Sequence, residues 1–182
     1  MIDEMGSYEY QYVLNELIKE NEYGGEPVLM SVLENKSGEQ FSIVGTEDNN
    51  PYLELKDLEG KPISLEKGYY ITSVMAMLQD LQAGDMFTVC NPLTLEEFEI
   101  KVEGIMDNDV QNAIFCDREN VAELLGIVAE CGNVIMSDIA LQIPEEKILQ
   151  TIKKSDAKEQ FQNMSNQMNV MIYFLIGMGA II

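Results

Sequence analysis

Much of the chain consists of short segments that suit strands, two of which, at residues 8–17 and 98–105, alternate between apolar and polar residues, and a few other segments have helical spacing. Alternation is typical of half-buried strands, and apolar residues at i, i+3, i+4 and i+7 are typical of one helix face. We therefore expect strands at residues 8–17, 28–33, 40–46, 52–56, 62–65, 68–71, 86–90, 98–105, 113–116 and 133–137.

Three segments have the helical pattern and suitable capping residues. Thr72 or Ser73 is placed to cap the first, Asp117 the second, and Pro144 stands at the first position of the third. The expected inward faces are Val74, Met77, Leu78 and Leu81 before Gly84; Val121, Leu124 and Leu125 before Gly126; and Ile148, Leu149 and Ile152. Together these elements predict an α+β domain with a mostly antiparallel sheet and two to three short helices. We find no internal repeat.

The end of the chain has a different character. Glu159 is the last charged residue; residues 160–169 are rich in amides and residues 170–182 are apolar throughout. A helix of 13 residues reaches about 20 Å, whereas a bilayer core is about 30 Å thick. Two interpretations remain: a helix or strand buried in the core of a soluble domain, or the truncated start of a transmembrane helix. The missing polar face and the Gly177-x-Gly179 pair favour the second.

Charge and composition exclude several classes of function. The chain has 32 acidic and 11 basic residues, for a formal net charge of -21. Such a surface repels phosphate backbones and anionic lipid headgroups, so we expect no nucleic-acid partner. Histidine is absent, which removes the imidazole needed for catalytic triads, Cys–His pairs and many metal sites.

No motif that carries chemistry is present. Cys90, Cys116 and Cys131 lack C-x-x-C spacing, and we interpret them as small core residues, of which at most two can pair. Neither nucleotide-binding glycine fingerprint occurs. We therefore predict no catalytic residue, no metal site, no cofactor and no enzymatic activity.

Two units between residues 67 and 105 carry a resemblance to a known family. The first is Ser73 followed by Leu78, Leu81, Gly84 and Asp85; the second is Val102, Gly104 and Ile105. Gly84-Asp85 suits a tight return from helix to strand, because glycine tolerates backbone conformations that other residues avoid. In this order the units resemble the extracytoplasmic domain of FtsX-like (MacB-like) ABC-transporter permeases, over about residues 40–182.

The resemblance implies a membrane protein with its body outside the cytoplasm. Residues 1–155 would be the extracytoplasmic domain, and residues 156–182 a helical juxtamembrane stalk that enters a membrane helix. The implied partners are the membrane, an ABC ATPase subunit bound by other parts of the permease, and a second permease copy or half. The residues expected to enter the membrane are Val170, Ile172, Tyr173, Phe174, Leu175, Ile176, Ile181 and Ile182.

Two other functions remain open at this point. The chain is a soluble acidic enzyme or ligand-binding domain if its apolar end is buried in the core. It is a surface adhesion module if that end serves only as an anchor. Neither alternative requires the permease motifs, whereas the family resemblance accounts for both the motifs and the apolar end.

Overall fold

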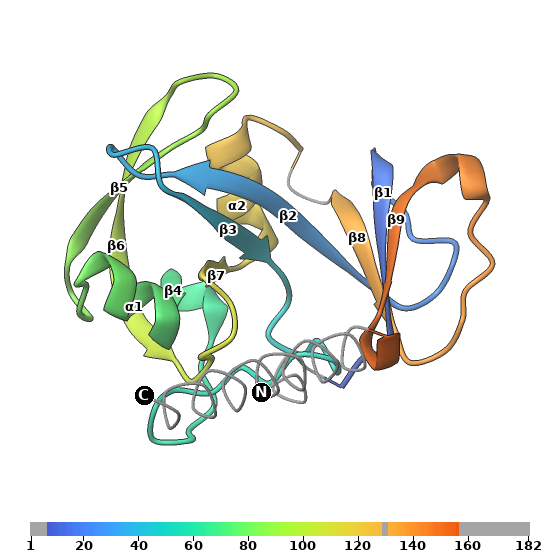
Figure 1. The fold of residues 1–182 in the computed structure, drawn as a ribbon, viewed down its shortest axis with the longest axis horizontal. Helices are drawn as coiled ribbons and strands as arrows, with labels where there is room; N and C mark the ends of the chain where they lie inside the picture. Colours follow the sequence, from blue (N-terminus) through green and yellow to red (C-terminus); the bar gives the residue numbers. More distant parts are fainter. Residues whose placement is uncertain (1–6, 129–130, 157–182) are drawn as a thin grey trace, which may run out of the picture.

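The computed structural model describes residues 7–128 and 131–156. In this part of the chain nine strands form one mixed sheet, and the helices α1 and α2 are short (Figure 1). The strands are β1 (Tyr10–Ile18), β2 (Glu26–Glu34), β3 (Gln40–Gly45), β4 (Tyr69–Thr72), β5 (Met86–Cys90), β6 (Glu97–Met106), β7 (Ala113–Cys116), β8 (Gly132–Ser137) and β9 (Ile148–Lys153). The helices are α1 (Ser73–Gln79) and α2 (Arg118–Leu125), with 3-10 turns η2 (Leu65–Lys67) and η3 (Glu145–Lys147).

The predicted α+β class is wrong, because the described chain is mainly a mixed β-sheet with few helical residues. The expected helical stalk begins at residue 156 and otherwise lies outside the described residues, as do the residues expected to enter the membrane. Within residues 7–128 and 131–156, no helix has the length and apolar character required to cross a bilayer.

The segment after Pro144 accounts for part of this difference. The sequence predicts a helix there, but the chain forms the turn η3 and then β9, which runs antiparallel to β1. Leu149, expected on the buried helix face, is 69% exposed. The open edge of β1 offers backbone hydrogen-bond partners, and a segment with Ile148, Thr151 and Ile152 is well suited to a strand, so pairing overrides the helical spacing.

Two short strands expected at residues 52–56 and 62–65 are also absent as regular strands. The chain instead forms a turn with two isolated bridges, Lys56 opposite Pro62 and Asp57 opposite Met106. The Asp57 carboxylate holds this turn by accepting hydrogen bonds from the backbone N–H groups of Glu59 and Lys61, both at 2.9 Å. An Asp side chain that satisfies local backbone donors is a common way to stabilise a tight turn.

Six of the nine strands form a closed ring. The strand order is β3-β7-β4-β6-β5-β2, and β2 pairs again with β3. Leu29–Glu34 of β2 lie opposite Gly45–Gln40 of β3, whereas β2 and β5 meet at one pair, Glu34 opposite Cys90. Beyond β2, the strands β8, β1 and β9 extend the sheet away from this barrel (Figure 1).

The barrel has a two-fold repeat in its topology. The hairpin β2–β3 is followed by β4 and α1, and the hairpin β5–β6 is followed by β7 and α2. The second strand of each hairpin runs parallel to the single strand of the other half: β3 beside β7, and β6 beside β4. The two single strands pair antiparallel with each other. No repeat is visible in the amino-acid sequence, so the repeat lies in the connectivity alone.

Aliphatic side chains fill the interior of the barrel. Each of its six strands contributes a side chain that is 0% exposed, and all six belong to one cluster. Met75 of α1 and Val121 of α2 pack against the same cluster. The interior is therefore a packed core and not a ligand cavity. The six strand residues are Leu33, Ile43, Ile71, Val89, Val102 and Ile114.

The helix α2 follows the sequence-based prediction, whereas α1 follows it at its start, where Thr72 accepts a hydrogen bond from the Met75 N–H at 3.3 Å, but not in its buried face. Asp117 caps α2 by accepting a hydrogen bond from the backbone N–H of Asn120 at 2.8 Å, and Gly126 ends it at φ 66°. In α1 the fully buried residue is Met75, whereas Met77 and Leu78 are 74% and 58% exposed. The helix is also shorter than expected and ends at Asp80. A helix of two turns buries few positions, so periodicity identifies its inner face poorly.

A side chain joins the barrel to the strands beyond it. The strand β2 pairs with β8 from Glu26 to Val28 and with β3 from Leu29 onward. Asn133 of β8 contacts β2 just beyond the end of the β2–β8 pairing. Its Oδ1 accepts from the Met30 N–H at 2.8 Å, and its Nδ2 donates to the Met30 carbonyl at 2.9 Å. The carboxamide thus takes the place of a backbone partner in the ladder.

Replacing Asn133 with alanine should lower the free energy of unfolding by about 1–2 kcal/mol, because two backbone groups of β2 lose their partners. Urea unfolding of the purified chain measures this change. Asn49→Ala is the matched control, since Asn49 is exposed; it should change stability by less than about 0.5 kcal/mol. Equal effects of the two substitutions would refute the bridging role.

Candidate functional site

The Gly-Asp unit and the second motif unit meet at the start of β5. The Gly84 N–H donates to the Val102 carbonyl at 2.7 Å, and the Val102 N–H donates to the Asp85 carbonyl at 2.9 Å. The Asp85 carboxylate accepts a hydrogen bond from the Gln82 N–H at 2.8 Å. Gly84 has φ 96°, a conformation that favours glycine. The expected tight turn is therefore present, and it fastens the entrance of β5 to β6.

Gly104 serves a second close contact in the same region. It lies opposite Tyr70 across the parallel β4–β6 pair, and a Cβ placed on it would lie 2.9 Å from the Tyr70 ring. The next residue, Ile105, is opposite Ile71 and packs against the barrel core. This half of the motif thus sets the spacing between two barrel strands.

The remaining motif residues are less closely involved. Ser73 begins α1, and its Oγ is buried without a hydrogen-bond partner among the described residues. Leu81 packs against the barrel core, whereas Leu78, which was expected on the inward face of α1, is 58% exposed. The motif residues therefore form a structural joint around α1, β5 and β6, with no arrangement for bond-making chemistry.

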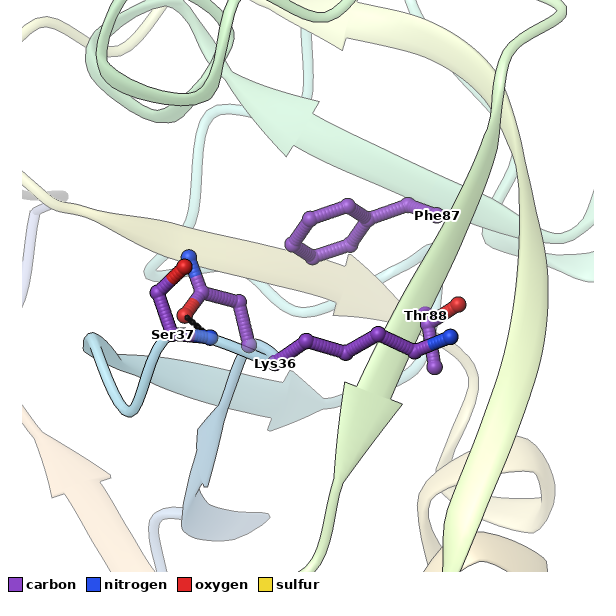
Figure 2. A pocket seen from close by; sticks show the side chains of 5 residues that line it. Lys36, Ser37, Phe87 and Thr88 are labelled. Carbon is purple, nitrogen blue, oxygen red and sulfur yellow. Dashed lines mark hydrogen bonds between the residues drawn. The ribbon is translucent and has the colours of Figure 1, made fainter.

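A shallow hollow of about 220 Å³ lies where β2 and β5 close the ring (Figure 2). It is lined by Asn35, Lys36 and Ser37 from the β2–β3 turn and by Phe87 and Thr88 from β5. The Phe87 ring packs against the Phe41 ring, with 5.7 Å between the ring centroids. The lining residues supply one cation, one hydroxyl from each side and an aromatic ring.

Hydrogen bonds around Asn35 fix the rim of this hollow. Its Nδ2 donates to Glu39 and to Gln79, both at 2.7 Å, and its Oδ1 accepts from the Ser37 N–H at 2.8 Å. The hydrogen bonds from Gln79 and then Asn35 lower the pKa of Glu39. On the other side, Lys36 lies 3.8 Å from Glu97 of β6. These polar contacts link β2 to β6 and α1 across the sparsely bonded seam.

A second hollow is acidic and lies at the carboxyl ends of the parallel strands β3 and β7. Three of its four carboxylates have structural partners: Asp117 caps α2, Asp48 accepts from the Leu65 N–H at 2.6 Å, and Glu47 binds Arg118, while Glu66 also lines the hollow. Among the described residues, no group of three or more Cys, Asp or Glu side chains is arranged to hold a metal ion. This hollow is therefore explained by capping and ion pairing.

The three cysteines are free thiols and unsuited to nucleophilic chemistry. Cys116 and Cys131 are buried, and Cys90 is half-buried. Burial and then the Asp117 charge raise the pKa of Cys116, and partial burial followed by Glu34 and Glu97 raises that of Cys90. Reactive cysteines have lowered pKa values, because the thiolate is the nucleophile.

No protein-family model and no curated protein matches the chain. The resemblance to FtsX-like permeases therefore remains an inference from the motif residues and from the chain's apolar end.

Gly104→Ala should destabilise the protein by about 1–3 kcal/mol, because the added methyl group collides with the Tyr70 ring. In a Tyr70→Leu background the same substitution should cost measurably less. Chemical unfolding of the four proteins of this cycle tests the contact. Glu99→Ala, an exposed position on the same strand, controls for alanine in β6. An identical Gly104→Ala cost in both backgrounds would show that the ring is not the obstacle.

Glu34→Gln should accelerate the reaction of Cys90 with a disulfide reagent at pH 8 about two- to threefold, because losing a nearby carboxylate lowers the thiol pKa. Cys116 should react only after unfolding. Absorbance kinetics of the released thiolate follow both sites, with Cys90→Ala identifying the faster one. Glu20→Gln, which removes an exposed charge elsewhere, should leave the rate unchanged. A rate that falls or stays constant in Glu34→Gln would contradict the electrostatic assignment.

Proposed function

We propose that this chain is the extracytoplasmic domain of an FtsX-like ABC-transporter permease. In this function the domain couples ATP-driven movement of membrane helices to substrate export or extraction, or to an external partner. The ATPase is a separate subunit that binds other parts of the permease, and a second permease copy or half completes the transporter. The domain itself carries out no catalysis.

The observation that carries this proposal is the position of the two ends of the domain. The Lys154 N–H donates to the Glu9 carbonyl at 2.8 Å, and Tyr10 lies opposite Lys153 in the β1–β9 pair. The chain therefore enters and leaves the domain at one place, near the bottom of Figure 1. This is the geometry that a domain inserted between two membrane helices needs. Neighbouring ends are common in domains, so the amino-acid sequence beyond them is the second support.

That sequence is suited to a membrane boundary. No charged residue follows Glu159, and residues 170–182 are entirely apolar. Charged side chains are costly inside a bilayer, so a long uncharged segment next to the exit of the domain is expected of a membrane attachment. The acidic body of the domain remains in water in this arrangement.

The packed barrel is suited to transmission of movement. Its core has one fully buried aliphatic side chain from each strand, and close-packed interiors resist deformation. A displacement of β1 and β9 therefore moves the domain as a body. ATP binding elsewhere then biases which of two arrangements the domain adopts, as in other rigid-body transitions.

Labelling in intact cells tests the location. Leu58 lies in a surface turn and is 60% exposed. In the native gene product with Cys90→Ala, Leu58→Cys should react with a membrane-impermeant maleimide before the cells are permeabilised. Cys90→Ala alone should remain unlabelled, since Cys116 and Cys131 are buried. Labelling that requires permeabilisation would rule out an extracytoplasmic domain.

Deletion of residues 160–182 separates the proposal from a soluble domain with a buried end. Under the proposal, the shortened chain keeps its free energy of unfolding to within about 0.5 kcal/mol and no longer sediments with membranes. If those residues were part of the core, each lost Leu, Ile or Phe side chain would cost about 2–5 kcal/mol. Urea unfolding and membrane fractionation distinguish the two results.

A further inference from the structure

The loop between β5 and β6, residues 91–96, exposes two leucines; we call it the hairpin tip. Leu93 is 90% exposed and Leu95 75% exposed, the two highest values among the large apolar side chains that the structure describes. Isolated exposed leucines are ordinary on protein surfaces. Here two of them lie in one hairpin loop, and neither is buried in the fold.

The hairpin tip is held in a defined conformation by Asn91. This residue is 4% exposed, and its Oδ1 accepts from the Leu93 N–H at 2.9 Å. Its carbonyl accepts from the Leu95 N–H at 2.8 Å, and its own N–H donates to the Glu96 carbonyl at 3.0 Å. The leucines therefore stand on an ordered support, which lowers the entropy lost when they bind.

The backbone at Leu95 is strained. Its φ is 61°, and the other described non-glycine residue with positive φ is Asp80, at the end of α1. Aspartate, asparagine and glycine tolerate this conformation, whereas a leucine there costs free energy. Asparagine or glycine would serve the turn better. The geometry of the turn therefore does not explain why a leucine occupies this position.

The surroundings of the hairpin tip are acidic. Glu96, Glu97 and Glu99 follow the leucines and are exposed. Lys36, 3.8 Å from Glu97, is the basic group paired with them. With a net charge of -21 on the chain, this end of the barrel attracts basic surfaces and repels a second copy of the same chain and anionic lipid.

We propose that the hairpin tip docks into an apolar pocket rimmed by Lys or Arg side chains on another protein. Leu93 and Leu95 enter the pocket, and the flanking glutamates pair with its rim. This inference rests on the proposed function for its direction: Figure 1 shows the hairpin tip at the top of the view and the two ends of the domain near the bottom. The hairpin tip thus points away from the proposed membrane, toward an external partner.

Fluorescence anisotropy with a defined probe tests this inference. The probe is a dye-labelled amphipathic helical peptide of leucine and lysine, and a lysine–serine peptide of equal charge reports binding by charge alone. Leu93→Ser/Leu95→Asn should weaken binding of the first peptide at least about tenfold, because both apolar side chains that the peptide would bury are removed. Leu58→Ser, a leucine with similar exposure in another turn, should change it less than about twofold.

Two further measurements keep the inference falsifiable. Leu95→Asn alone should unfold at the same or a higher urea concentration than the unmodified chain while binding the peptide more weakly; a clear loss of stability would make Leu95 a structural residue. Peptide affinity unchanged in the double variant overturns the inference. So does binding of the chain to phosphatidylcholine–phosphatidylglycerol vesicles that depends on the two leucines. These assays do not depend on which side of a membrane the domain lies. Failure of the maleimide experiment would therefore refute the proposed function without refuting the docking inference.

Discussion

The double use of β2 is the constraint on which the rest of the structure depends. One edge of this strand pairs with β3, and its other edge is shared between β8 at its start and β5 at its end. Unpaired strand edges are unfavourable in water and promote association. The single bridge to β5 and the Asn133 carboxamide at Met30 complete this second edge. Where backbone pairing is sparse, the Asn35 network and the Lys36–Glu97 contact hold the seam instead, beside the hollow in Figure 2.

The amino-acid sequence contains enough to locate most strands but not to arrange them. Alternation marks β6 correctly, and Asp117 and Gly126 bound α2 as expected, because these signals are local. The strand β9 is not predicted, because its apolar spacing also fits a helix. The edge of β1 that makes it a strand is distant in sequence. Ring closure and the parallel pairs likewise depend on non-local contacts. No local pattern in the strands encodes the two-fold topology.

The candidate site could be predicted in part. The Gly84-Asp85 turn has a local reason that is legible in the sequence, whereas the reason for glycine at 104 is the Tyr70 ring on a neighbouring strand, which only the structure shows. The exposed position of Leu78 is not legible in the sequence either, because a short helix has several apolar residues and only the packed structure selects Met75 as the inner one. The hairpin tip is hidden in the sequence for a different reason: the exposure and the positive φ of Leu95 depend on how the loop folds. The signal was a pair of leucines in a loop otherwise made of polar residues and proline.

The arrangement of strands also connects the proposed transmission of movement with the proposed docking of the hairpin tip. Movement delivered at β1 and β9 reaches the barrel through β8 and β2, since these strands are consecutive neighbours in the sheet. At β2 it meets a core in which every barrel strand contributes a fully buried side chain. A tightly packed core does not deform gradually, so the displacement is passed on and not absorbed. The hairpin β5–β6 belongs to this barrel wall, and Asn91 fixes its end. Under the proposed function, displacement at one end of the domain therefore displaces Leu93 and Leu95 at the other.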